Sequence, residues 1–544
     1  TVTLAAPLTA PSIMSRSNLY ANRAKISIPF LLQKQDRYNI INILFNMANT
    51  FDDKDLLCND LPTKFRADIG RILVTGASGY IGGRLVPELL ERGYKVRAMA
   101  RRAVSTYSSL WPTAEVVAAD VHNADALRAA LENIDTAYYL IHSLNLGPKK
   151  FAGADIDAAM NFSKIAEEKH VKRIIYLGGL GDVRSSLSSH LRSRAEVARE
   201  LRRGATPVTV LRAAVIVGSG SASYEIIQHL VRRLPIILIP SWAKNRCQPI
   251  AIRDVVKYLV GILETPETEG QSFDIGGKDV LTYEKMLRIL AELLREKRFF
   301  ISIPFSNIWL YAYVASLLTP VPESITECLM ESLKNEVICQ DNSIKKFIPF
   351  EPLSYRDAII KAISREERDR VYTRWSDAYH PDYDLAMRLN ELKTKPAYIA
   401  SYSIITGKDA SRLFKSICRI GGREGWFHSN WLWRLRGDID RVLLGVGSAR
   451  GRKSYSSLKI NDVIDFWRIE DMQENKRLLL RAEMRLPGKA WLEFDIKEEG
   501  LRRKLNVTAY YDTQGLFGRI YWYICLPLHH FIFHNLIKEI NKRS

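Results

Sequence analysis

The sequence predicts an α/β protein that begins with a doubly wound parallel Rossmann sheet carrying a helical cap and ends in an α+β domain. Three observations favour this fold class. Short β-branched or apolar runs alternate with helical patterns from Arg71 onward, a glycine-rich turn follows the first run, and strand-like segments separated by turns return near the C-terminus. The 544 residues, 47% of them hydrophobic, suffice for two or three domains.

The first domain is expected over residues 70–278. Its strands are expected at 72–75, 95–100, 115–118, 136–141, 173–177, 208–212 and 272–274. Its helices are expected at 81–92, 124–132, 156–169, 187–203 and 254–263. Each helical segment places apolar residues three or four apart, which is the spacing of one helix face.

Three regions should follow this domain. Residues 279–370 indicate a helical cap over the carboxyl edge of the sheet, with helices at 283–297 and 324–335. The apolar run 303–318 is interrupted and too short to span a membrane, so a buried helix is expected there. Residues 371–399 form a charged linker, and residues 400–544 the α+β domain. Its strands are expected at 463–469, 477–484, 490–496 and 504–511, closed by a helix at 521–542.

Residues 1–69 form an N-terminal extension. Residues 1–46 carry five basic side chains against one acid, together with several Ser and Ala, a composition that resembles an organellar transit peptide. An unstructured extension without a targeting role fits the same composition. In that case a cytoplasmic location, with or without membrane association, is expected.

The net charge of +19 favours contact with polyanions or anionic lipid. No zinc-finger spacing or aromatic RNA-binding motif accompanies it, so a nucleic-acid partner is not expected, whereas peripheral membrane contact stays open. The six cysteines lie far apart without a C-x-x-C pair, which indicates a reducing compartment. His530 and His534 have the spacing of a metal pair but no acidic third ligand, so no metal is expected.

A glycine loop links the first strand to the first helix. Gly76, Gly79 and Gly82 provide a tight turn, close approach of the backbone to a pyrophosphate, and close packing of helix on strand. The intervening Ser78, Tyr80 and Ile81 lie at the helix N-terminus, where unpaired N–H groups bind phosphate. These residues are the expected core of the cofactor site.

The second strand ends in Arg101 and Arg102, where a protein selective for NAD usually carries an acid that binds the ribose 2′-hydroxyl. Guanidinium groups bind a 2′-phosphate with charge-assisted hydrogen bonds, so NADP(H) is favoured over NAD(H). The alternative is that both arginines are simply solvated. Asp120 and Val121 follow the third strand and are expected near the adenine.

These residues resemble the atypical and extended short-chain dehydrogenases/reductases, especially their NmrA-like branch. The resemblance covers residues 70–365 and extends to the segments Leu211–Ala213, Pro249–Val255 and Phe273–Gly277. It implies an oxidoreductase whose Tyr-x-x-x-Lys pair follows the fifth strand. Here His190 replaces the tyrosine and Arg194 the lysine.

These two replacements leave catalysis open. His190 can transfer a proton and Arg194 can hold a ribose hydroxyl, but a structural or cofactor-contacting role fits His190 as well. His142 and Ser143 follow the fourth strand, and Gly178 and Gly179 end the fifth. The topology places these four residues toward the nicotinamide.

Residues 400–544 resemble the uncharacterised domain that follows an NmrA-like reductase in bacterial-type two-domain proteins. The matching segments are rich in Trp, Gly and Arg, for example Gly421–Trp426 and Trp431–Asp440. The resemblance implies a START-like helix-grip fold around an apolar cavity. The alternative is that Trp426, Trp431, Trp433 and Trp491 simply fill the core.

Three functions are therefore expected. The first is an NADP(H)-dependent oxidoreductase for an apolar carbonyl, quinone or lipid-like substrate that the C-terminal domain holds or delivers. The second is a cofactor-binding regulator, or an accessory subunit of a larger redox complex such as respiratory complex I. The third is a lipid-binding module at a membrane surface.

Overall fold

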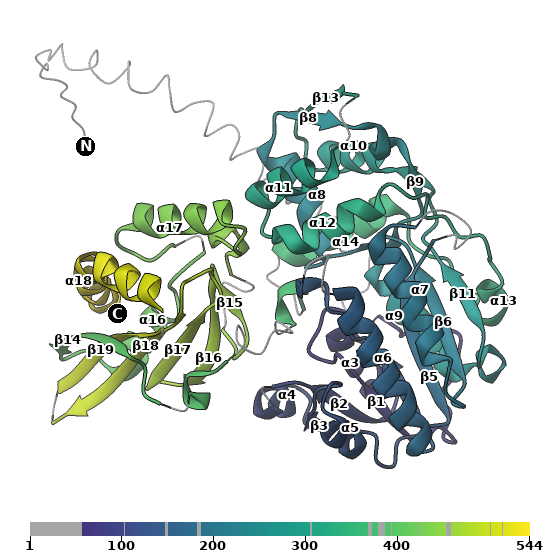
Figure 1. The fold of residues 1–544 in the computed structure, drawn as a ribbon, viewed down its shortest axis with the longest axis horizontal. Helices are drawn as coiled ribbons and strands as arrows, with labels where there is room; N and C mark the ends of the chain where they lie inside the picture. Colours follow the sequence, from purple (N-terminus) through teal and green to yellow (C-terminus); the bar gives the residue numbers. More distant parts are fainter. Residues whose placement is uncertain are drawn as a thin grey trace, which may run out of the picture. The chain divides into compact units, whose positions relative to one another are not determined.

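The structure, a computed structural model, describes residues 57–544 apart from 103, 147–150, 182–186, 305–306, 368–372, 379–386, 393, 423, 453–457, 501 and 514 (Figure 1). The expectations for residues 1–56, including the transit-peptide interpretation, lie outside the described residues.

A seven-stranded sheet forms the centre of the first domain, and all its neighbouring strands are parallel. The strand order is β11-β6-β5-β4-β1-β2-β3. The bounds are β1 Arg71–Val74, β2 Lys95–Ala100, β3 Glu115–Ala118, β4 Thr136–Tyr139, β5 Arg173–Gly179, β6 Val208–Ala213 and β11 Ser272–Ile275. The order reverses between β1 and β4, which creates the crevice where such sheets bind ligands.

Helices cover both faces of this sheet, as predicted (Figure 1). They are α3 Gly82–Glu91, α4 Val104–Leu110, α5 Ala124–Ala130, α6 Phe151–Glu168, α7 Ser189–Leu201 and α9 Ile252–Glu264. One apolar core joins the sheet to α3, α4 and α9, for example through Leu85 and Val255. The other core joins it to α5, α6 and α7 through Leu127 and Phe162. The doubly wound α/β fold is therefore confirmed.

The cap takes in a segment that was expected to belong to the sheet domain. Its elements are α8 Ala222–Arg233, β8 Ile236–Ile239, α10 Tyr283–Leu293, β13 Phe299–Ser302, α11 Ile308–Leu318 and α12 Glu323–Ser332. Strand β13 pairs with β8 in parallel, and α8 shares a core with α11 and α12. The other elements are the short strands β7 Ile216–Val217, β9 Arg246–Cys247, β10 Ile250–Ala251 and β12 Leu281–Thr282, the short helix α13 Ile344–Phe347 and the longer helix α14 Tyr355–Glu367.

Helix α11 corrects one expectation. The run 303–318 was expected to form a buried helix, but Trp309, Leu310 and Val314 are exposed. Only one side of α11 packs, through residues such as Ala312 and Ala315. An apolar composition on all sides therefore did not mean burial on all sides.

The C-terminal domain contains an antiparallel sheet, as predicted, but with six strands instead of the four expected, in the order β14-β19-β18-β17-β16-β15. The strands are β14 Tyr398–Thr406, β15 Val463–Ile464, β16 Trp467–Gln473, β17 Arg477–Ala482, β18 Lys489–Glu499 and β19 Arg502–Asp512. The helices are α16 Ala410–Ile417, α17 Asn430–Val442 and α18 Leu516–Arg543. Strand β14 begins inside the expected linker. The strand expected at 463–469 is broken at Asp465, which has a positive φ of 54°.

Aromatic residues fill much of the space between this sheet and its helices. Trp426, Trp433 and Phe533 belong to one apolar cluster, and Trp491 is also buried. Trp431 is 65% exposed, so the idea that all four tryptophans fill the core is wrong for this residue. The START-like cavity remains a prediction.

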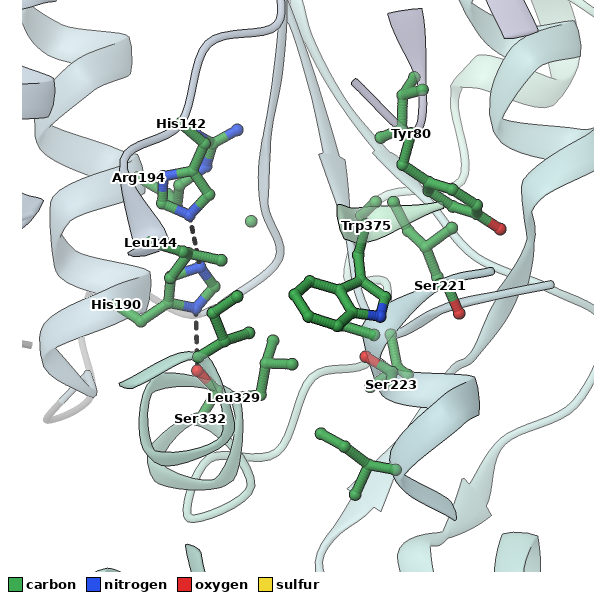
Figure 2. A pocket seen from close by; sticks show the side chains of 18 of the residues that line it. Tyr80, His142, Leu144, His190, Arg194, Ser221, Ser223, Leu329, Ser332 and Trp375 are labelled. Carbon is green, nitrogen blue, oxygen red and sulfur yellow. Dashed lines mark hydrogen bonds between the residues drawn. The ribbon is translucent and has the colours of Figure 1, made fainter. Parts of the chain in front are cut away.

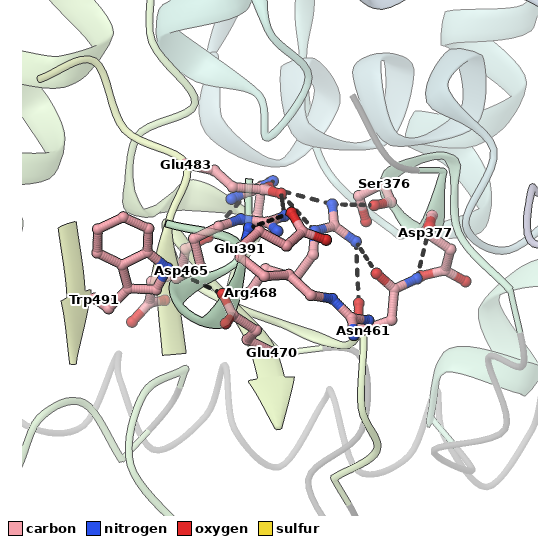
Figure 3. Close-up of polar contacts among 12 residues, drawn as sticks. Ser376, Asp377, Glu391, Asn461, Asp465, Arg468, Glu470, Glu483 and Trp491 are labelled. Atoms are coloured by element: carbon pink, nitrogen blue, oxygen red, sulfur yellow. Dashed lines mark hydrogen bonds and ion pairs between the residues drawn. The ribbon is translucent and has the colours of Figure 1, made fainter. Parts of the chain in front are cut away.

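The segment Thr373–Asp377, expected to be linker, is held from both sides. The Thr373 hydroxyl donates to the Tyr80 carbonyl (2.9 Å) in the glycine loop. From the C-terminal domain, Arg468 donates to the Ser376 carbonyl (2.7 Å), as Figure 3 shows. The linker is thus part of the packed structure at this point.

Candidate functional site

The glycine loop adopts a conformation that requires glycine. Gly76 has a φ of +63°, and a Cβ there would lie 2.8 Å from the Leu140 carbonyl oxygen. The Gly79 N–H donates to the Gly76 carbonyl (2.9 Å). A Cβ on Gly82 would lie 2.4 Å from the Gly76 oxygen, so this third glycine permits close packing of α3. The loop geometry fits a bound pyrophosphate.

A cavity of about 550 Å³ begins at this loop, and its volume is within the range of small-molecule sites. Most of the predicted site residues line it: Gly76, Ser78, Gly79, Tyr80, Ile81, Arg101, Asp120, Val121, His142, Ser143, Gly178, Gly179, His190 and Arg194. Gly82 and Arg102 are not among its lining residues. Arg102 forms an ion pair with Glu391. Residues predicted at the ends of five different strands therefore meet at one cavity.

Four polar side chains beside the cavity form a continuous hydrogen-bonded chain, which we name the relay: Asp155, His142, His190 and Ser332. Figure 2 shows His142, His190 and Ser332 of this relay. Asp155 Oδ2 lies 2.6 Å from His142 Nδ1. His142 Nε2 lies 3.2 Å from His190 Nε2, and His190 Nδ1 lies 3.0 Å from Ser332 Oγ. The relay connects α6, the end of β4, α7 and the cap helix α12.

The environment lowers the pKa of both histidines in the relay. Burial, and then the positive charges of His142 and Arg194, lower the pKa of His190 well below its ordinary value. Burial and Arg194 also lower the pKa of His142, although Asp155 opposes this effect. Burial alone would raise the pKa of Asp155, but its hydrogen bond from His142 and the nearby positive charges lower it. The relay thus contains one carboxylate and two imidazoles with lowered pKa values.

Arg194 acts on the relay through its charge, because its guanidinium is directed toward β5. It donates to the Leu177 carbonyl and lies 4.9 Å from the Tyr176 ring centroid. Its Nη1 is buried and, among the described residues, has no hydrogen-bond partner. A donor of this kind at the cavity wall fits a hydroxyl or phosphate oxygen of a cofactor.

The far part of the cavity is apolar and is built mainly by the cap. Its wall includes Ile226, Leu230, Ile239, Met286, Leu329 and Leu333. Trp375 completes the wall and is fixed by a hydrogen bond from its Nε1 to Glu225 Oε2 (2.8 Å). An apolar ligand portion of moderate size would be enclosed here, next to the relay.

Asp155, Ser332 and Trp375 were not predicted as site residues. Asp155 directly precedes the helix expected at 156–169, and Ser332 lies within the helix expected at 324–335. Nothing in their spacing relates them to His142 or His190. Trp375 did carry a signal, because a large aromatic residue in a charged linker requires a site of burial.

Comparisons with known proteins agree with this geometry. Residues 76–231 match the family described as "NAD(P)H-binding", and residues 394–536 match a "Protein of unknown function" family.

One relative is the "NADH dehydrogenase [ubiquinone] 1 alpha subcomplex subunit 9, mitochondrial" of Arabidopsis thaliana, 21% identical over 52% of this chain and 74% of that protein. Another is the "Divinyl chlorophyllide a 8-vinyl-reductase, chloroplastic" of Oryza sativa subsp. indica, 25% identical over 46% of this chain and 67% of that protein. The match to a "3-beta-hydroxysteroid dehydrogenase" of Mycolicibacterium neoaurum, 29% identical, covers 20% of this chain and only 32% of that protein.

Among solved structures, the triphenylmethane reductase of Citrobacter sp. complexed with NADP(H) matches 54% of this chain and 99% of its own, at 18% identity and a TM-score of 0.44. The family match and the loop geometry lead to the same conclusion. The first domain is a Rossmann domain that matches the NAD(P)H-binding family, and the chain is similar to proteins named as dehydrogenases and reductases.

Proposed function

We propose that the protein is an NADP(H)-dependent oxidoreductase that reduces an apolar carbonyl or quinone-like substrate. One observation carries the proposal: a single cavity joins the glycine loop, the relay and the apolar wall of the cap. The cofactor and an apolar substrate could therefore meet beside a chain of proton-transferring groups.

The residues that would hold the cofactor follow from the cavity wall. The backbone of Gly76 and Gly79 with Ser78 would bind the pyrophosphate, Asp120 and Val121 would adjoin the adenine, and Arg101 would bind a 2′-phosphate. His142, Ser143, Gly178 and Arg194 line the part assigned to the nicotinamide and its ribose. When bound, NADP(H) supplies or accepts a hydride.

The relay would supply the proton that the tyrosine of a Tyr-x-x-x-Lys pair supplies in short-chain dehydrogenases/reductases. Starting from protonated His142, the Ser332 hydroxyl donates its proton to the carbonyl oxygen as that oxygen gains charge. His190 Nδ1–H then donates to Ser332, and His142 Nε2–H donates to His190 Nε2. One proton has left His142 and both histidines end neutral. The new His190 Nε2–H can donate to His142 Nε2, and the restored Ser332 hydroxyl can donate to His190 Nδ1.

The cap wall supports an apolar substrate, because burial of a polar one against Leu329, Leu333 and Trp375 would leave its groups without partners. The helix-grip interpretation of the C-terminal domain belongs to the same proposal, with that domain holding or delivering the ligand.

The test is NADPH consumption by the full chain with a panel of lipid, quinone and isoprenoid carbonyls. Turnover that is lost in His190→Ala is the expected result. Tight binding of NADPH without turnover across the panel would contradict the reductase and favour the second candidate below.

The second candidate is a cofactor-binding regulator or an accessory subunit of a redox complex. It is favoured by the absence of the Tyr-x-x-x-Lys pair at residues 190–194 and by the likeness to the NADH dehydrogenase subunit. Migration with a larger assembly on native gels of the source tissue would support it. A monodisperse protein that is active alone would contradict it.

A further inference from the structure

Helices α17 and α18 present apolar side chains to solvent along one face each. On α17 these are Trp431, Leu435, Ile439 and Val442, and on α18 they are Phe517, Ile520, Ile524, Leu528 and Phe531. We name this set the α17/α18 surface. Phe517 is 81% exposed, Ile524 67% and Trp431 65%. Single exposed apolar residues are common, but a group at regular helical spacing marks a contact surface.

Helices α17 and α18 are neighbours within the C-terminal domain (Figure 1). The ring of His428, just before α17, lies 5.5 Å from that of Phe531 on α18. On the inner side, Trp433 of α17 lies 6.3 Å from Phe533 of α18, within the apolar core. Each helix therefore has a buried apolar face that holds it to the domain and a second apolar face directed outward.

The charge pattern around this surface identifies its partner. Residues 513–538 contain no Asp or Glu but include Arg519 and Lys538, both exposed. Arg434 is exposed on α17, where Asp438 follows four residues later. Helices with an outward apolar face and basic flanks lie in the interface of anionic bilayers. Trp and Tyr side chains are enriched at membrane–water interfaces, and Trp431 and Tyr523 are both exposed on these helices.

We propose that the α17/α18 surface docks the protein onto an anionic lipid bilayer, with both helices lying in the interfacial layer. Within the described residues, no helix is long and apolar enough to cross a membrane, so the contact would be peripheral. The proposal does not depend on the reductase activity, because it rests on a surface in another domain.

The test is flotation of the full chain with vesicles of phosphatidylcholine that contain about one third phosphatidylglycerol, compared with pure phosphatidylcholine vesicles. The double variant Phe517→Ser/Ile524→Ser is expected to bind the mixed vesicles at least about tenfold more weakly than the wild type. The matched control is Phe299→Ser/Ile301→Ser on β13, where both residues are exposed (71% and 47%), and it should bind like the wild type. Arg519→Gln should weaken binding at low salt and reduce its salt dependence.

Unchanged melting temperature and NADPH affinity would show that the variants are folded. If the α18 double variant does not fold, Arg519→Gln replaces it as the test, and unchanged binding of this variant to the mixed vesicles at low salt would overturn the proposal. Equal binding by both double variants, or no binding by the wild type, would overturn the proposal. Light scattering would also overturn the proposal if the wild type were a dimer and Phe517→Ser/Ile524→Ser a monomer. The α17/α18 surface would then bind a second copy of the chain and not a membrane.

Discussion

Glu483 in the C-terminal domain is surrounded by three arginines, whereas the carboxylate of Asp155 beside the cavity meets histidine. Arg450 lies 2.7 Å from Glu483 Oε2, and Arg468 and Arg481 pair with the same carboxylate. We name these four residues the arginine cluster; Figure 3 labels Glu483 and Arg468. Burial would raise the pKa of Glu483, but the charges of Arg468 and Arg450 hold it well below its ordinary value.

The arginine cluster and the relay differ in their ability to exchange protons. Every member of the arginine cluster stays charged near neutral pH, and none of the four lines the cavity. Three of the four relay members line the cavity, and burial lowers the pKa of both its histidines, whose ring nitrogens can donate and accept protons. A permanently charged buried cluster fixes structure, whereas a titratable chain that reaches a cavity is suited to chemistry.

The largest effect is expected from Glu483→Gln. This change leaves buried guanidinium groups without their carboxylate and should lower the free energy of unfolding by about 3–5 kcal/mol. Urea unfolding measures it, with the exposed Glu498→Gln as the matched control. A loss no larger than that of the control would mean that the arginine cluster is not structural.

The next effect should come from Ser332→Ala and His190→Ala, which interrupt the relay at its cavity end. Each should lower kcat/KM by about 10²–10³-fold, the usual contribution of a positioned acid, with little change in melting temperature. Ser189→Ala is the control, because this serine is on the same helix as His190 but does not line the cavity. Full activity in Ser332→Ala would exclude Ser332 as the proton donor.

Asp155→Asn should reduce kcat by about tenfold and shift the pH profile. Asp155 raises the pKa of His142 against the effect of burial, so its loss lowers that pKa further. Protonated His142 then becomes populated only at lower pH. Because the reaction requires this protonated form, kcat/KM falls as the pH rises through the pKa of His142, and in the variant this fall occurs at lower pH. An unshifted profile would show that Asp155 has only a packing role.

Arg101 and Arg102 extend the same comparison to the cofactor. Arg101 lines the cavity, whereas Arg102 pairs with Glu391. Arg101→Ala should weaken NADPH binding by about tenfold with little effect on NADH, because it removes one charge-assisted contact. Arg102→Ala should leave the preference unchanged. Titration of both nucleotides by calorimetry checks this, and equal effects of the two variants would contradict it.

The smallest effect concerns the pH dependence of stability. Burial lowers the pKa of His529 to about 4. Because the folded pKa is below that of the unfolded chain, His529 stabilises the fold fully above about pH 6.5, and this contribution is lost as the pH falls toward 4. His529→Gln should therefore show a smaller fall in melting temperature across this window. Parallel curves for variant and wild type would refute this.

The sheet and the glycine loop could be predicted because their signals are local. Alternating apolar runs place β2 and β3 at the residues expected, and the three glycines follow β1 directly. The segment 222–239 was missed as part of the cap, because β8 has its pairing partner in β13, about 60 residues further along the chain.

The relay could be predicted only in half. The position of His190 and Arg194 after β5, and of His142 after β4, followed from topology. Asp155 and Ser332 could not be found, since their meeting with the histidines depends on how α6 and α12 pack. Periodicity along one helix contains no information about which helix lies opposite.

The anchored linker has a practical consequence for dividing this chain. A fragment ending at Glu367 would retain every strand of the parallel sheet but lose Thr373, which caps the Tyr80 carbonyl, and Trp375, which closes the cavity wall. Ser376 and Asp377 next to them accept hydrogen bonds from Arg468 and Asn461 of the other domain. Separating the domains at this boundary would therefore remove part of the wall of the cavity and expose its interior to solvent.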